Sequence, residues 1–157
     1  MKTSDIIKKV YEKFGPQILE AENDGEFLTY NVVPEKAIEM IEYLYNEPEL
    51  AYRYLTTLFA VHYPETSQMT MHYLLHNLEK NSRIRIKAVL SDTNPEISTL
   101  TGVFSAANWL ERETYDFFGV KFIGHPNLKR ILNVEDMIIH PLRKEYPLED
   151  QMREDKK

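Results

Sequence analysis

In the stretch from Arg83 to Leu90, apolar side chains occupy every second position and basic side chains occupy most of the positions between them. Because successive residues of a β-strand point to opposite faces of a sheet, this pattern predicts a strand with one face in the core and the other wet or against a partner. A chain that contains such a strand must build a sheet around it. The apolar face carries Ile84, Ile86, Ala88 and Leu90, and the other face carries Arg83, Arg85 and Lys87.

The remaining periodicities predict an α+β fold. Apolar residues at three- and four-residue steps predict helices, and short apolar runs between turn signals predict strands. Strands come in runs and not in strict alternation with helices, which favours a two-layer domain with helices on one face of a mostly antiparallel, mixed sheet. The predicted helices are Ser4–Phe14, Glu35–Asn46 and Ser105–Phe117, with a helix or turn at Glu96–Thr101; the other predicted strands are Ile18–Glu22, Phe27–Val33, Tyr52–His62, Gln68–Asn77 and a short Lys121–Ile123.

We expect one α+β domain over residues 1–124, followed by an extended segment over residues 125–157. Periodicity fades after Gly119, Asn127–Asn133 reads as a single turn, and Pro141 and Pro147 interrupt the segment. An extended apolar-studded segment without a core of its own needs another surface to lie on, which predicts packing on a partner subunit. The last nine residues are expected to be disordered in isolation.

Composition excludes several classes of function. The 157 residues contain no cysteine, which excludes disulfides, thiolate metal sites, cysteine-bound clusters and a cysteine nucleophile in this chain. A net charge of −6 argues against nucleic acid as the main partner. No apolar run approaches the roughly 20 residues of a membrane-spanning helix, so we expect a soluble, intracellular protein. Acidic residues outnumber basic ones over residues 1–118, whereas basic residues outnumber acidic ones between residues 121 and 144, which suits a partner surface with patches of both signs.

Residues Asn108–Leu132 concentrate the polar groups that chemistry would need. A metal site is conceivable from carboxylates three residues apart on a helix and two later histidines, and an acid pair for general acid–base catalysis fits the same carboxylates. Against a metal site, the histidines lie in separate loops. We therefore favour an ion-pair network in which Arg112 binds Asp116 at i,i+4, with Arg83 and Arg85 as further counter-charges. The metal hypothesis uses Glu113, Asp116, His125 and His140.

The remaining motifs indicate structure. His62, His72 and His76 lie in predicted strands and are interpreted as satisfied or solvent-facing polar residues; His72 and His76 share a face opposite Met69, Met71, Tyr73 and Leu75. Neither a dinucleotide fingerprint, a P-loop nor a Gly-x-Ser-x-Gly elbow is present. Aromatic residues around Gly119 are interpreted as core and interface anchors. They are Phe117, Phe118 and Phe122.

One spaced signature resembles a known family. It comprises Glu111, Arg112, Glu113, Asp116, Phe117, Phe118, His125, Lys129, Ile131 and Leu132. This pattern, with the later runs GHPNLKRIL and HPLRKEYPLED, resembles the thirty-kilodalton subunit family of respiratory complex I, the NADH:quinone oxidoreductase C subunit.

The resemblance implies a non-catalytic structural subunit of the hydrophilic arm that holds the quinone-site subunit. It implies no cofactor in this chain, with FMN and iron–sulfur clusters in partner subunits, and a peripheral place on the cytoplasmic side of a bacterial inner membrane. The signature residues would be structural or interfacial, and Lys121, Arg130, His140, Arg143 and Lys144 would join His125 and Lys129 in meeting the neighbour. Two alternatives stay open: the equivalent subunit of a membrane-bound hydrogenase or other non-NADH reductase, and an independent carboxylate–histidine metal enzyme.

Overall fold

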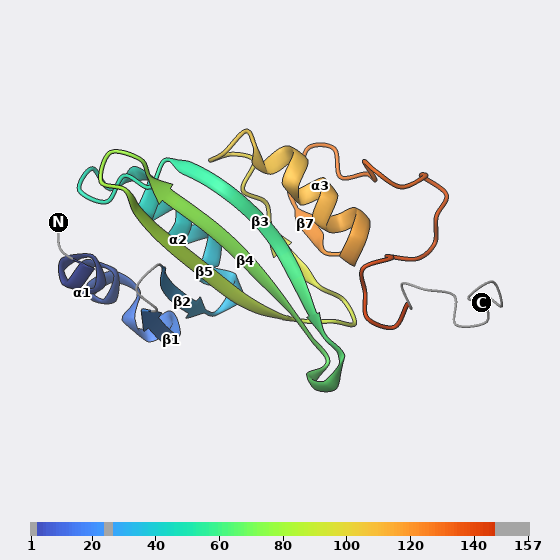
Figure 1. Ribbon diagram of the computed structural model, residues 1–157, viewed down its shortest axis with the longest axis horizontal. Helices are drawn as coiled ribbons and strands as arrows, with labels where there is room; N and C mark the ends of the chain where they lie inside the picture. Colours follow the sequence, from blue (N-terminus) through green and yellow to red (C-terminus); the bar gives the residue numbers. More distant parts are fainter. Residues whose placement is uncertain (1–2, 24–26, 147–157) are drawn as a thin grey trace, which may run out of the picture.

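A five-stranded sheet forms the centre of the molecule in the computed structural model, which describes residues 3–23 and 27–146 (Figure 1). The strand order is β1-β2-β5-β4-β3. Part of the hairpin turn expected at Asn23–Gly25, and the last nine residues expected to be disordered, lie outside the described residues. The strands are β1 (Ile18–Asn23), β2 (Leu28–Val32), β3 (Tyr54–Tyr63), β4 (Gln68–Asn77) and β5 (Ser82–Ser91).

Strand pairing confirms the predicted α+β class with a mixed, mostly antiparallel sheet. The pairs β1–β2, β3–β4 and β4–β5 are antiparallel, and only β2 and β5 run parallel. The predicted parity of β4 and β5 is also confirmed, because Met71 lies opposite Ala88 and Tyr73 lies opposite Ile86 in the register. All four of these side chains are buried.

Helices cover the apolar face of the sheet. Helix α1 (Thr3–Phe14) lies beside β1 and β2, and α2 (Pro34–Asn46) lies behind β5 and β4 in Figure 1. Helix α3 (Ala107–Phe118) packs beside β3. Two short 3-10 helices, η1 (Gly15–Gln17) and η2 (Pro64–Thr66), lead into and out of strands. The apolar stripe of α2 is completely buried and consists of Ala37, Met40, Ile41 and Leu44.

A second, two-stranded sheet corrects one prediction. The helix or turn predicted at Glu96–Thr101 is wrong at its start, because Glu96–Ser98 is strand β6 and pairs in parallel with β7 (Lys121–Ile123). Buried Ile97 lies opposite buried Phe122 in this pair. A three-residue strand has too few positions to show a period, so long-range pairing decides its conformation.

The basic row of β5 lies on the face opposite the helices. Arg83, Arg85 and Lys87 alternate with the buried residues of the strand, so they point away from α3. The prediction that Arg83 and Arg85 neutralise the carboxylates of α3 is therefore wrong.

Residues 124–146 contain no helix or strand and follow an extended path beside α3 (Figure 1). Within the described chain, no helix is both long and apolar enough to cross a membrane.

Candidate functional site: a carboxylate that anchors the C-terminal segment

The carboxylate of Asp116 is the centre of the polar cluster on α3. Its side chain is completely buried. Burial of a charged carboxylate is costly unless hydrogen-bond donors or a cation stabilise the charge. Oxygen Oδ2 accepts hydrogen bonds from the backbone N–H groups of Ile131, Leu132 and Asn133, at 3.0, 2.8 and 2.9 Å. Three consecutive amides thus converge on one oxygen, which fixes the chain where it turns past the helix.

Arg130 completes this anchor from the other oxygen. Its Nη1 lies 2.6 Å from Asp116 Oδ1, and Nη2 donates to the carbonyl oxygens of Met137 and Ile139 at 2.6 and 2.7 Å. One guanidinium therefore joins helix α3 to two points of the following chain.

The protonation of Asp116 follows from these contacts. Burial alone would raise its pKa, but the amides of Asn133, Leu132 and Ile131 and the Arg130 guanidinium outweigh burial. Together they hold the pKa of Asp116 well below its ordinary value. The group is a carboxylate throughout the neutral range.

Arg112 does not bind Asp116, so the predicted i,i+4 ion pair is wrong. Its Nε donates to the carbonyl oxygen of Lys129 at 3.2 Å, and its Nη2 donates to that of Arg130 at 3.1 Å. The loop lies over this face of α3 and supplies partners to both side chains. Arg112 therefore holds the carbonyl groups of the loop, while Asp116 holds its amide groups.

The side chain of Glu111 is completely buried and, unlike Asp116, does not bind the described part of the C-terminal segment. Its carboxylate accepts hydrogen bonds from Thr99 Oγ1 at 2.5 Å and from the backbone N–H of Leu100 at 2.6 Å. Burial raises the pKa of Glu111 to about 7, although these two hydrogen bonds act in the opposite direction. Glu111 thus ties α3 to the turn that follows β6.

The structure does not bring the four proposed metal ligands together. Glu113 is exposed. His125 lies with Nε2 3.2 Å from the carbonyl oxygen of Asn108, and its Nδ1 accepts the N–H of Asn127 at 3.0 Å. Both nitrogens of His125 are therefore occupied. Among the residues described, no group of three or more histidine and acidic side chains can hold a metal ion.

His140 closes the end of α3. Its Nδ1 lies 3.0 Å from the carbonyl oxygen of Asp116, and its ring meets that of Tyr115 edge to face. Gly119 ends the helix with a φ of 77° and leaves room for this ring, because a Cβ there would lie 2.7 Å from His140 Cδ2. A glycine is required here for both conformation and space.

His62 receives the far end of the segment, a contact that no pattern in the sequence predicts. The backbone N–H of Lys144 donates to His62 Nδ1 at 3.1 Å, and Nε2 lies 3.3 Å from Asp92 Oδ2. Arg143 donates to the carbonyl oxygen of Asp92. The described part of the segment, residues 125–146, is therefore held by its own domain at α3 and at His62, and its packing on a partner subunit stays a prediction.

The other predicted site residues lie around this anchor. Phe117, Phe118 and Ile131 are half-buried, whereas Lys129 and Leu132 are exposed. Lys121 lies apart and binds Asn94 and Glu96 at 2.9 and 3.3 Å.

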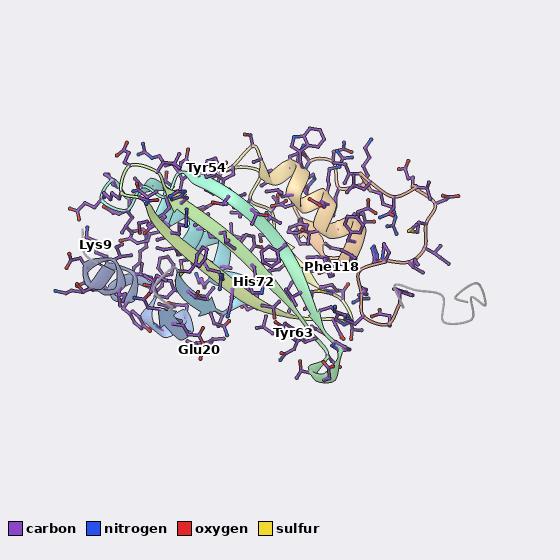
Figure 2. The ribbon with its side chains drawn as sticks, viewed as in Figure 1. Lys9, Glu20, Tyr54, Tyr63, His72 and Phe118 are labelled. Carbon is purple, nitrogen blue, oxygen red and sulfur yellow. The ribbon has the colours of Figure 1, made fainter. Side chains whose placement is uncertain are left out.

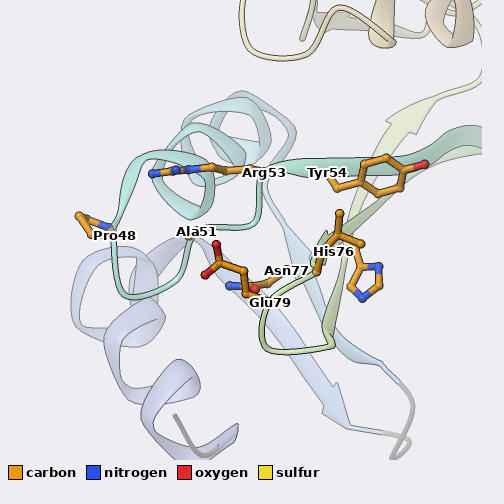
Figure 3. Close-up of a pocket in the computed structure, with 8 residues that line it drawn as sticks. Pro48, Ala51, Arg53, Tyr54, His76, Asn77 and Glu79 are labelled. Carbon is orange, nitrogen blue, oxygen red and sulfur yellow. The ribbon is translucent and has the colours of Figure 1, made fainter.

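A cavity of about 290 Å³ lies away from these residues, between the start of β3 and the end of β4 (Figure 3). None of the signature residues lines it. Its lining includes Arg53, Tyr54, His76 and Leu78.

The fold and the anchor define a class: a two-layer α+β domain whose last helix binds an extended C-terminal segment of the same chain. The family model described as respiratory-chain NADH dehydrogenase, 30 kDa subunit, matches residues 30–152. The chain belongs to this family, which confirms the resemblance of the spaced signature.

Relatives extend the match over most of the chain. The C subunit of the NADH-quinone oxidoreductase of Geobacter metallireducens is 38% identical over 154 residues, which cover 97% of this chain and 94% of the relative. A solved trypsin-resistant fragment (1–134) of Nqo5 is 25% identical with a TM-score of 0.66, covering 82% of this chain and all of the fragment. A chain of an archaeal membrane-bound sulfane sulfur reductase has the same fold, with a TM-score of 0.81 at 22% identity over 99% of this chain and 98% of that one.

Replacing Asp116 by Asn tests the anchor. The amide keeps one acceptor oxygen but presents its NH₂ group to Arg130 and Asn133, so we expect the free energy of unfolding to fall by about 3–5 kcal/mol. Because the pKa of Asp116 is lowered on folding, its contribution is present above the ordinary aspartate pKa of about 4 and is lost as the pH falls below it. Urea unfolding between pH 2 and pH 7 measures both effects. Asp136→Asn, an exposed change in the same segment, is the control, and equal stabilities for the two variants would contradict the anchor.

Replacing Gly119 by Ala tests the contact with His140. The left-handed φ and the close approach should together lower the free energy of unfolding by about 1–3 kcal/mol. Gly102→Ala is the matched control, because nothing lies within 4 Å of its Cβ position and its effect should stay within about 0.5 kcal/mol. Urea unfolding of both variants gives the comparison. A Gly119→Ala protein as stable as the control would show that His140 does not occupy this position.

Proposed function

We propose that this chain is the C subunit of a proton-translocating NADH-quinone oxidoreductase and contributes to catalysis by position and not by chemistry. Its relatives of that name and its family support the first part. The use of the polar signature residues to hold the chain's own elements supports the second part, because the hydrogen bonds of Asp116, Arg112 and Glu111 all go to groups of this chain.

The observation that carries the proposal is the presentation of Ile138. Arg130 binds the carbonyl groups on both sides of this residue, at Met137 and Ile139. The Ile138 side chain between them is 94% exposed. An apolar side chain that is fixed outward by its own backbone is suited to enter a pocket of another polypeptide, because little further conformational entropy is lost on binding.

Other large apolar side chains are also exposed, among them two in the same segment as Ile138 and one on α3. Leu132 and Val134 precede Ile138 in the anchored segment, and Trp109 lies on α3 with the Arg112 guanidinium over its ring. Large exposed apolar groups on an ordered segment are typical of a protein–protein interface. The partner-binding role expected for Lys129, His125 and Lys144 is compatible with a basic rim, although their backbone and ring contacts also serve the fold.

The proposed partners follow from this role. The chief neighbour is the quinone-site subunit, with iron–sulfur subunits nearby, and FMN and the clusters belong to those partners. The chain itself is peripheral, on the cytoplasmic side of a bacterial inner membrane through the complex.

A second candidate is the equivalent subunit of another membrane-bound reductase. A chain of the membrane-bound sulfane sulfur reductase has the same fold, which supports this candidate. The copurifying chains discriminate the two: a flavin-bearing, NADH-oxidising partner set supports the first, and a set without NADH oxidation supports the second.

The test is purification of the tagged full chain with its complex. The isolated chain should be inert toward NADH and quinone, and removal of the chain should abolish NADH–quinone activity in the complex. Turnover by the isolated chain would overturn the positional role.

Ile138→Ser should weaken assembly without affecting folding. Because the side chain makes almost no contact in the isolated chain, the melting temperature should not change, whereas loss of an interface anchor reduces partner retention by about tenfold or more. Leu19→Ser, an exposed leucine on β1, is the matched control. Full retention by the Ile138 variant would remove this residue from the interface.

A further inference from the structure

The sheet has an uncovered face, which we call the open face. It consists of the β3, β4, β5 and β2 side chains that point away from α1, α2 and α3. No helix or strand of the described chain lies in front of β3, β4 and β5 in Figure 1, and Figure 2 shows Tyr54, His72 and Tyr63 along this side. The register aligns Phe59, His72, Lys87 and Asn31 in one row across four strands.

The open face is not a plain solvated surface. An antiparallel sheet with one wet face carries polar side chains on that face. Here β3 instead presents three aromatic side chains, Tyr54, Phe59 and Tyr63, which are 50%, 38% and 45% exposed. Apolar Val61, Leu74 and Val89 lie half-buried around them. The cavity at Tyr54 and His76 continues this surface at one end (Figure 3).

A basic row lies on β5, separated from the aromatic strip of β3 by β4. Arg83, Arg85 and Lys87 follow one another on β5, in a chain whose net charge is −6. Arg85 lies over the ring of Phe27 at 4.5 Å, and Lys87 reaches Glu22 only at 4.0 Å. Arg85 and Lys87 therefore place two positive charges in the middle of the sheet, and the only ion pair of Lys87 among the described contacts is the long one to Glu22.

Two buried polar atoms in the central row lack a hydrogen-bond partner within the described residues. They are His72 Nε2 and Asn31 Oδ1. His72 is 9% exposed and stacks on Phe59 at a centroid distance of 4.9 Å. Burial, with smaller effects of Lys87 and Arg85, lowers the pKa of His72 to about 4, so the imidazole is neutral at pH 7. Buried polar atoms without a partner are uncommon in folded domains, and these two lie in the same row as Phe59 and Lys87.

We propose that the open face is a second docking surface, which binds an acidic, partly apolar surface of another subunit of the same complex. The inference rests on the proposed function and adds an interface on the side opposite the helices. Aromatic residues supply the buried contact area, and the basic row selects carboxylates. A symmetric pair of copies would bring two basic rows together, which disfavours a second copy of this chain. Glu20 and Glu22 at the β1 edge disfavour a nucleic acid.

Lysine labelling of the purified complex tests the proposal. The probe is acetic anhydride, which acylates accessible amines. Lys87 should react at least about tenfold more slowly in the complex than in the isolated full chain. Lys8 is the matched control, because it also lies 4.0 Å from a glutamate, Glu12, and should react equally in both. Unchanged reactivity of Lys87 in a complex that forms normally would overturn this inference and leave the proposed function intact.

Carbodiimide coupling identifies the occupant. The reagent joins Lys87 Nζ to a carboxylate in contact with it, and we expect a bond to an Asp or Glu of another subunit. Coupling to Glu22 alone, or to a second copy of this chain, would overturn the proposal. A wild-type chain that copurifies with no other subunit would overturn the proposed function and this inference together.

Charge reversal gives an independent measurement. The double variant Arg85→Glu/Lys87→Glu should keep the melting temperature within a few degrees and retain at least about tenfold less partner. Lys8→Glu/Lys36→Glu changes the net charge equally on α1 and α2 and should retain the partner fully. Equal retention by both double variants would contradict the open-face interface.

Discussion

The buried carboxylate of Asp116 is the contact on which the C-terminal part of the molecule depends. Burial of a charge is costly unless several donors meet it, and here three backbone amides, one guanidinium and one side-chain amide do so. All of these donors belong to residues 130–133. The charge of Asp116 therefore orders a segment that has no helix or strand of its own.

In our proposal, the same contact lets this domain serve an enzyme complex by position. Arg130, which is bound to Asp116, also donates hydrogen bonds to the carbonyl oxygens of Met137 and Ile139. The backbone on both sides of the exposed Ile138 is therefore fixed. His140 and His62 fix the chain further along. In our proposal, one partner surface meets this preformed segment on one side of the domain, and another meets the open face of the sheet on the other side.

Sequence reasoning predicted the elements with a clear period and missed contacts made over long distances. The alternation through Ile84 and Ile86 placed β5 and its buried face correctly, and the order of the predicted elements indicated the α+β class with a mostly antiparallel sheet. Local spacing also paired Arg112 with Asp116, which is wrong because loop groups at residues 129–133 reach both side chains. The contact of His62 with Lys144 joins residues 82 positions apart, and no periodicity carries that information. The spaced signature, in contrast, identified the family correctly although it could not say what each residue binds.

Hydrogen exchange at Ile131, Leu132 and Asn133 tests the central claim most directly. If the Asp116 carboxylate orders the segment, these three amides of the full chain should exchange at least about a hundredfold more slowly than in an unstructured peptide, and Asp116→Asn should remove that protection while leaving the amides of β4 protected. Exchange of the three wild-type amides at the unstructured rate would contradict the account.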